Sequence, residues 1–155
     1  MNKTTTTVLS PNGRESEAAI RSVVFYDGVC ALCHWTVKFL IKIDRQATLR
    51  FAPLQGKTVR KFTLVPTEPS EKAQGVIYVQ NADTLQERTF FQSDAILEIF
   101  KEIGGIWRTV AWLRIIPVSF RNALYKMIAK NRYKWFGKYS TCRLPETTDR
   151  HRFLE

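Results

Sequence analysis

The sequence predicts an α/β fold with one core and a helical C-terminal extension. Apolar runs of strand length alternate with segments of helical period in the order β-α-β-α-β-β-α, and two more helical segments follow. Two cysteines, Cys30 and Cys33, stand where the first strand gives way to the first helix. The chain of 155 residues is long enough for one well-packed domain and short for two.

The first three elements predict a βαβ unit. Residues 23–26 are a short apolar run bounded by turn residues, which is typical of a buried strand. A strand over residues 48–52 ends at Pro53. We expect these two strands to be parallel, with a right-handed crossover. The helix between them should be largely buried, because one face carries apolar residues at helical spacing: Leu32, Trp35, Phe39, Leu40 and Ile43.

The next segments predict a hairpin followed by a helix. Residues 56–62 favour a short helix, and residues 64–74, which contain two prolines, favour a loop. Strands over 75–79 and 85–91 flank a turn at 81–84. Ser93 is the expected N-cap of a helix that has Asp94 in its first turn and ends at Gly104-Gly105. This order of elements matches the thioredoxin core.

Two helices are predicted beyond this core. One covers residues 107–116, and the other runs from Pro117 to about Asn131, with an apolar face of Phe120, Leu124, Met127 and Ile128. The predicted organisation is therefore a flexible tail (1–21), a thioredoxin-like core (22–104), a basic helical extension packed on the core (105–145) and a second tail (146–155).

Positive charge is concentrated in the C-terminal third. The net charge is +10, and residues 101–143 hold ten basic side chains against Glu102 alone. This asymmetry favours an acidic partner, and a binding module that docks on an anionic membrane or nucleic acid is the alternative to an enzyme. Of these two partners, peripheral contact with an anionic membrane is expected rather than nucleic acid. A solvated basic helix face would also explain the pattern.

Cysteine usage and the N-terminus favour the cytoplasm. Three cysteines leave one unpaired in any disulfide framework, unlike a small secreted protein. Residues 1–22 have no apolar region of the kind that signal peptides carry, and no uninterrupted apolar run approaches 18 residues. We expect a cytoplasmic protein with thiols reduced at rest.

Cys30 and Cys33 have the spacing of a redox dithiol. Exchange needs a thiolate that attacks and a second thiol that resolves the mixed disulfide. At a helix start, unpaired N–H groups and the helix dipole lower a thiol pKa from about 8.5 to roughly 3.5–7.5. Cys30 is therefore the predicted nucleophile and Cys33 the resolving thiol. Asp27, three residues earlier, is either a proton relay to Cys33 or a turn residue whose charge raises the pKa of Cys30.

Other chemistries share parts of this pattern. Cys30-Ala31-Leu32-Cys33-His34 also has the form of a c-type haem attachment site, with Met127 or His151 as second ligand. Cys30, Cys33, Cys142 and a histidine could bind zinc, although no second closely spaced pair is present. The cysteines could also be buried core residues. A dithiol mechanism needs neither metal nor cofactor, so none is expected.

Five blocks in order resemble the DCC family, named for its Asp-x-x-Cys-x-x-Cys motif. They are Asp27 to Cys33; Arg50-Phe51-Ala52-Pro53-Leu54-Gln55; Ser93-Asp94-Ala95-Ile96-Leu97; Ile116-Pro117 with Arg121 and Tyr125; and residues 128–137, followed by Cys142. The resemblance implies a thioredoxin-like fold and thiol-disulfide oxidoreductase activity. The expected partners are a disulfide-containing protein or small-thiol substrate and an unidentified reductant.

The last blocks suggest supporting residues. Within Asn131-Arg132-Tyr133, Arg132 could fold back and stabilise a thiolate, which would offset Asp27; alternatively this is a basic helix end favoured by the dipole. Cys142 is a possible third redox thiol, a regulatory thiol or an idle buried one. One departure from thioredoxins stands out, since residues 72–75 before the third strand contain no proline where a cis-proline normally faces the dithiol.

Overall fold

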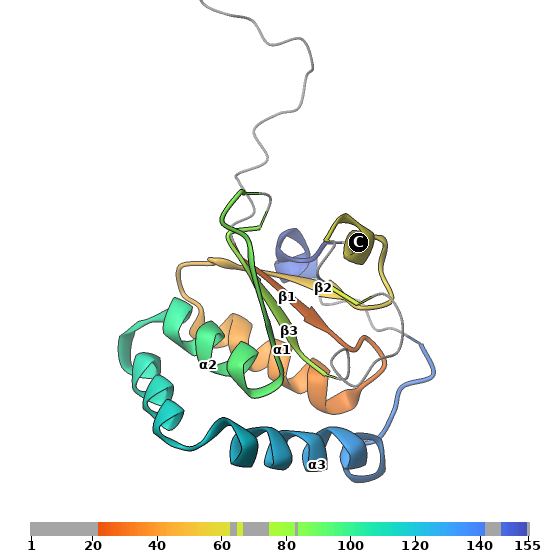
Figure 1. Ribbon diagram of the computed structural model, residues 1–155. Coiled ribbons are helices and arrows are strands. Elements are labelled where there is room, and N and C mark those ends of the chain that lie inside the picture. Colours follow the sequence, from red (N-terminus) through yellow and green to blue (C-terminus); the bar gives the residue numbers. More distant parts are fainter. Residues whose placement is uncertain (1–21, 63–64, 67–74, 83, 142–146, 155) are drawn as a thin grey trace, which may run out of the picture.

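The computed structural model describes residues 22–62, 65–66, 75–82, 84–141 and 147–154 (Figure 1). The predicted N-terminal tail, nearly all of the predicted loop 64–74, and Cys142 lie outside these residues. None of the described helices is long and apolar enough to cross a membrane.

A four-stranded mixed sheet forms the centre of the molecule, in the order β2-β1-β3-β4. The strands are β1 (Ser22–Tyr26), β2 (Leu49–Pro53), β3 (Ile77–Gln80) and β4 (Arg88–Phe91). The pair β1 and β2 is parallel, which confirms the predicted βαβ unit. The pairs β1–β3 and β3–β4 are antiparallel, and the latter is the predicted hairpin. This arrangement is consistent with a thioredoxin-like fold.

Both faces of the sheet are covered. Helices α1 (Ala31–Ile43) and α2 (Gln92–Ile103) lie on one face (Figure 1), where Val24 and Tyr26 join the cluster that contains both cysteines. On the other face, Val23 and Phe25 pack near the short 3-10 helix η1 (Lys57–Lys61). Every residue of β1 is buried, which explains why the sequence there is continuously apolar rather than alternating.

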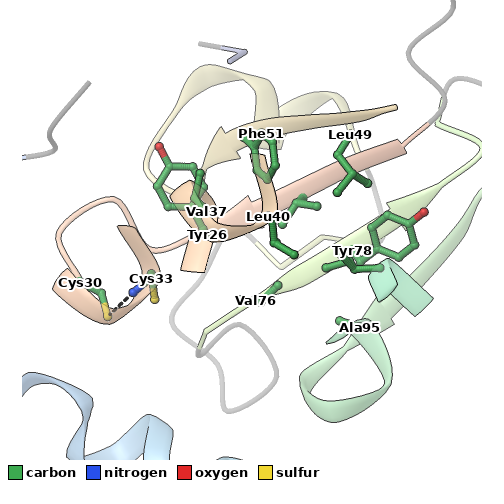
Figure 2. Close-up of a cluster of buried hydrophobic side chains, with 12 residues drawn as sticks. Tyr26, Cys30, Cys33, Val37, Leu40, Leu49, Phe51, Val76, Tyr78 and Ala95 are labelled. Carbon is green, nitrogen blue, oxygen red and sulfur yellow. Dashed lines mark hydrogen bonds between the residues drawn. The ribbon is translucent and has the colours of Figure 1, made fainter. Parts of the chain in front are cut away.

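Helix α1 buries a stripe that overlaps the predicted one only at Leu40. Its buried residues are Cys33, Val37 and Leu40, which are spaced i, i+4 and i+7. Figure 2 shows them in one buried cluster with Phe51 of β2 and Tyr78 of β3. Trp35, predicted on the buried face, is 65% exposed and stacks on Phe39. The apolar surface of this helix is wide, so periodicity alone did not identify which part of it meets the sheet.

Helix α2 begins two residues earlier than predicted, and Ser93 is not its N-cap. Phe91 occupies that position, without a side-chain capping bond. The Ser93 hydroxyl instead bonds Asn122 and accepts from Arg121, both on the later helix α3. The Ser93 hydroxyl is therefore engaged in contacts between α2 and α3 and does not cap the start of α2. The helix ends at Gly104, as predicted, with a positive φ of 72° that favours glycine.

The C-terminal extension differs from the prediction in type, length and orientation. The segment Gly105–Ile115 (η3) is a 3-10 helix, and α3 (Val118–Phe136) continues past Asn131 to Phe136. Most of the predicted apolar face of α3 is turned to solvent, although Ile128 is half-buried. Phe120 is 65%, Leu124 49% and Met127 48% exposed. The helix is held to the core by its polar side.

Residues 147–154, within the segment predicted as a tail, pack on the core. After the 3-10 helix η4 (Thr147–Arg152), Phe153 packs against Phe51 of β2. The Leu154 N–H donates to the Phe51 carbonyl at 2.8 Å. Arg152 forms a buried ion pair with Asp44, at the C-terminal end of α1. These long-range contacts explain the order of a segment whose composition is mostly polar.

Candidate dithiol site

Cys30 is the N-cap residue of α1. The Asp27-Gly28 turn closes through a hydrogen bond from the Cys30 N–H to the Asp27 carbonyl, 3.2 Å long. Cys30 keeps extended backbone angles, and its sulfur accepts from the Cys33 N–H at 3.4 Å (Figure 2). In this position an oxygen-bearing side chain normally satisfies one of the unpaired N–H groups at the helix start. Here a sulfur does so, which favours its thiolate form.

The pKa values of the two thiols are shifted in opposite directions. A hydrogen bond from the Cys33 side chain is the main reason why the pKa of Cys30 falls from 9.0 to about 6. The Cys33 N–H and the positive charge of Arg132 also lower it, whereas burial and Asp27 oppose the change. For Cys33, the same hydrogen bond, burial and the nearby Cys30 charge all raise the pKa. Cys30 is therefore the acidic thiol and Cys33 its protonated donor.

Asp27 is a buried carboxylate with several donors. Its Oδ1 atom accepts from the Val29 N–H at 3.1 Å and from the Gln55 amide at 3.0 Å. Its Oδ2 atom accepts from Arg132 at 2.9 Å and from the Tyr133 hydroxyl. Burial acts to raise the pKa of Asp27, but together these hydrogen bonds outweigh it and the pKa is lowered. Its predicted role as a proton relay stays a prediction.

Arg132 folds back from α3 into the dithiol site. The Arg132 and Asp27 side chains are only 9% and 6% exposed, so this pair is not a solvated helix end. The Arg132 guanidinium also donates to the Tyr133 hydroxyl at 3.0 Å. Asn131, the third residue of this block, instead donates to the Met127 carbonyl within α3. The site therefore includes Arg132 and Tyr133, while Asn131 faces away.

The segment that follows α3 covers Cys30. The Ala31 N–H donates to the Gly137 carbonyl, and the Tyr139 N–H donates to the Val29 carbonyl at 2.8 Å. Lys138 forms a β-bridge with Cys30 between these two bonds. We call residues 137–139 the covering segment. Cys30 is 0% and Cys33 5% exposed, so a substrate reaches either thiol only if the residues around them move.

Another wall of the site is formed before β3, where thioredoxins have their cis-proline. Val76 packs in the same cluster as both cysteines, and its N–H donates to the Tyr125 hydroxyl at 2.8 Å. A Cβ placed on Gly75 would collide with that hydroxyl, and the Gly75 φ of 110° also favours glycine there. No cis peptide bond occurs in the described part of the chain.

The residues of the alternative chemistries are arranged differently. The His34 Nε2 atom lies 2.8 Å from the Gly28 carbonyl, so this nitrogen is engaged in a hydrogen bond rather than open to a haem iron. Among the described residues, no group of three or more His, Cys, Asp or Glu side chains is placed to hold a metal ion. Cys142 lies outside the described residues.

Sequence reasoning had assigned no role at the site to Gln55 or Tyr125. Gln55 bridges the site by donating to Asp27 and accepting from the Gly28 N–H at 3.1 Å. Both residues belong to blocks that resemble the DCC family, and this was the one signal that could have identified them.

The fold and site together define a thioredoxin-like protein with a Cys-x-x-Cys dithiol at a helix start. Residues 24–138 match the family model described as DCC1-like thiol-disulfide oxidoreductase, and the chain belongs to this family. It is 32% identical to the uncharacterized protein YuxK of Bacillus subtilis, over 90% of this chain and 98% of that one. It is 34% identical to a DCC family protein of Arabidopsis thaliana named as chloroplastic, over 80% of this chain and 70% of the relative. No solved structure matches significantly.

Proposed function

We propose that this protein is a thiol-disulfide oxidoreductase in which Cys30 attacks and Cys33 resolves. The observation that carries the proposal is the hydrogen bond from the Cys33 N–H to the Cys30 sulfur at the start of α1, 3.4 Å long. With a pKa of about 6, Cys30 is roughly nine-tenths thiolate at pH 7. Family membership supports the same reaction class.

The reductive direction runs in two balanced steps. The Cys30 thiolate attacks one sulfur of a substrate disulfide, so a Cys30–substrate bond forms, the substrate S–S bond breaks, and the first substrate thiolate leaves and takes up a proton. Cys33 then loses its proton and attacks the Cys30 sulfur. This closes the Cys30–Cys33 disulfide and releases the second substrate thiol. The substrate gains two electrons that the dithiol loses. The reverse sequence oxidises a substrate dithiol.

Access requires displacement of the covering segment. Two backbone hydrogen bonds and the Lys138 bridge hold it over Cys30, and glycine at position 137, with a φ of 88°, sits at its start. A bound substrate strand could replace these hydrogen bonds with its own. The substrate class is a protein or small-thiol disulfide, and a separate reductant restores the dithiol.

The test uses Cys142→Ser protein, in which Cys30 and Cys33 are the only cysteines. We expect reduction of insulin disulfides in the presence of a chemical dithiol, and a Cys30 pKa near 6 from the pH dependence of alkylation. Cys30→Ser should abolish exchange. Cys33→Ser should accumulate a mixed disulfide with substrate, visible by non-reducing electrophoresis and mass spectrometry. An ordinary Cys30 pKa together with no exchange in either direction would refute the proposal.

A further inference from the structure

Helix α3 is attached to the core by its polar side. Arg121 forms an ion pair with Asp94 at 2.9 Å. Further along the same face, Tyr125 and Arg132 reach the dithiol site through the bonds described above. Arg121, Tyr125 and Arg132 are spaced i, i+4 and i+11, which places them on one side of a helix. These polar contacts join α3 to both α2 and the dithiol site.

Another side of α3, about 100° around the helix axis from these residues, carries an apolar stripe that faces solvent. We define the outer stripe as Phe120, Leu124, Met127 and Trp135, which are spaced i, i+4, i+7 and i+15. All four are between 48% and 65% exposed. Figure 1 shows α3 along one edge of the molecule, with its far side uncovered by the described chain.

The preceding helix η3 also exposes apolar side chains. Four of its large side chains are 49% to 83% exposed, namely Ile106, Trp112, Leu113 and Ile115. Single exposed apolar residues are ordinary, but a run of them on two consecutive elements is typical of a docking surface. Both elements connect directly at Ile116-Pro117.

The charge around this surface has one sign. Between residues 103 and 145 the sequence contains no Asp or Glu. Arg114 and Arg121 pair with acids of α2, and Arg132 pairs with Asp27. Exposed cations remain on both elements: Arg108 on η3, and Lys130 and Lys134 on α3 beside the outer stripe. This surface is therefore apolar with a basic border.

We infer that η3 and the outer stripe of α3 dock on an anionic lipid surface. A helix lies in a bilayer interface when aliphatic and aromatic side chains enter the acyl boundary and lysines meet anionic headgroups. Tryptophans such as Trp112 and Trp135 favour this boundary. A second copy of the chain would bring like charges together, and nucleic acid offers no acyl layer for Leu124 and Met127.

This orientation has a consequence for the dithiol. The last turn of α3 carries Arg132 and Tyr133 into the site, and the covering segment follows immediately. A docked α3 therefore holds Cys30 close to the bilayer surface. The docking itself does not depend on redox activity, so a Cys30→Ser protein should bind vesicles as the unaltered protein does.

The experiment is vesicle co-sedimentation of the full chain at low and physiological salt. Vesicles of phosphatidylcholine with phosphatidylglycerol should bind the protein and shift its tryptophan emission to the blue, and vesicles of phosphatidylcholine alone should bind it far less. Leu124→Gln/Met127→Gln should weaken binding on the order of tenfold. Lys130→Gln/Lys134→Gln should weaken it about 25-fold at low salt, since each lysine near an anionic surface contributes about fivefold.

Matched controls remove the same chemistry elsewhere. Arg60→Gln/Lys61→Gln deletes two exposed charges on η1, across the sheet, and Leu85→Gln deletes an exposed apolar side chain between β3 and β4. Both should bind as the unaltered protein does. The inference is overturned by absence of binding at low salt, or by equal losses in controls and test variants. It is also overturned if the test substitutions change only the dimerisation of the protein and leave vesicle binding unchanged. Binding to an oligonucleotide that only the lysine variant loses would likewise overturn it.

Discussion

Two buried arginine–aspartate pairs hold opposite ends of α1, and they differ in what surrounds them. Arg132 reaches Asp27 just before the helix starts, and Arg152 reaches Asp44 where it ends. The partners are 105 and 108 residues apart in the sequence. Both pairs join a C-terminal segment to the core, so both resist separation of that segment.

The difference lies in the other contacts of each carboxylate. Asp44 accepts from the Thr48 N–H, the Thr48 hydroxyl and the Leu49 N–H, which fixes the turn into β2. Asp27 and Arg132 instead lie near the Cys30 and Cys33 thiols, and both influence their pKa values. The Arg152–Asp44 pair is therefore structural alone. The Arg132–Asp27 pair also shifts the pKa values of the thiols, because Cys30 and Cys33 lie close to it.

The largest expected effect is on stability at the structural pair. Arg152→Met should lower the free energy of unfolding by about 3–5 kcal/mol, because it leaves the Asp44 carboxylate buried without its ionic partner. Urea denaturation measures this loss. The pKa of Cys30 should stay at its unaltered value in the folded variant, and a changed pKa would contradict the distinction between the pairs.

The matched substitution at the dithiol site should change both the stability of the protein and the pKa of Cys30. Arg132→Met should cost about 3 kcal/mol of stability, and it should also raise the pKa of Cys30, because a positive charge is lost while Asp27 remains. Alkylation rates measured against pH report the pKa independently of denaturation. If stability falls while the pKa stays constant, Arg132 has only the structural role that Arg152 has.

The thiolate should also make stability depend on pH. The folded pKa of Cys30 lies below its unfolded value, so unfolding takes up a proton at intermediate pH and stability rises with pH. This contribution is lost as pH falls through about 6, and it should grow by about 2 kcal/mol between pH 6 and pH 8 in the reduced protein. Urea denaturation over this range should show the rise in Arg152→Met and less of it in Arg132→Met. Cys30→Ser should lack it altogether.

The smallest expected effect concerns Tyr133. Tyr133→Phe removes one donor to the Asp27 carboxylate and should cost about 1 kcal/mol, since Arg132, Gln55 and Val29 still donate. The pKa of Asp27 should rise, because the Tyr133 hydrogen bond is the strongest contribution that lowers it. Carboxyl titration by NMR would detect this rise, and an unchanged Asp27 pKa would exclude Tyr133 as a significant donor.

Access to the thiol can be tested separately from its acidity. Tyr139→Pro removes the N–H that donates to the Val29 carbonyl and should loosen the covering segment. We expect faster alkylation of Cys30 at every pH with the same pKa. A parallel shift of the pKa would mean that the covering segment also stabilises the thiolate.

The sequence by itself determined the order of strands and helices and the position of the dithiol at the start of α1. Apolar runs and their spacing reflect local geometry, which is why β1, the βαβ unit and the hairpin were predicted correctly. The Cys-x-x-Cys spacing likewise fixes two sulfurs on one helical turn. Periodicity shows which side chains share a face, but it does not show what covers that face.

The tertiary structure decided everything that depends on distant partners. Trp35 and the outer stripe of α3 are exposed because the core contacts other sides of their helices. Ser93 bonds α3 rather than capping α2, and Phe153 packs on β2. Arg132 meets Asp27 across 105 residues of chain. No local pattern encodes such a meeting, because it depends on how the whole chain folds back around the sheet.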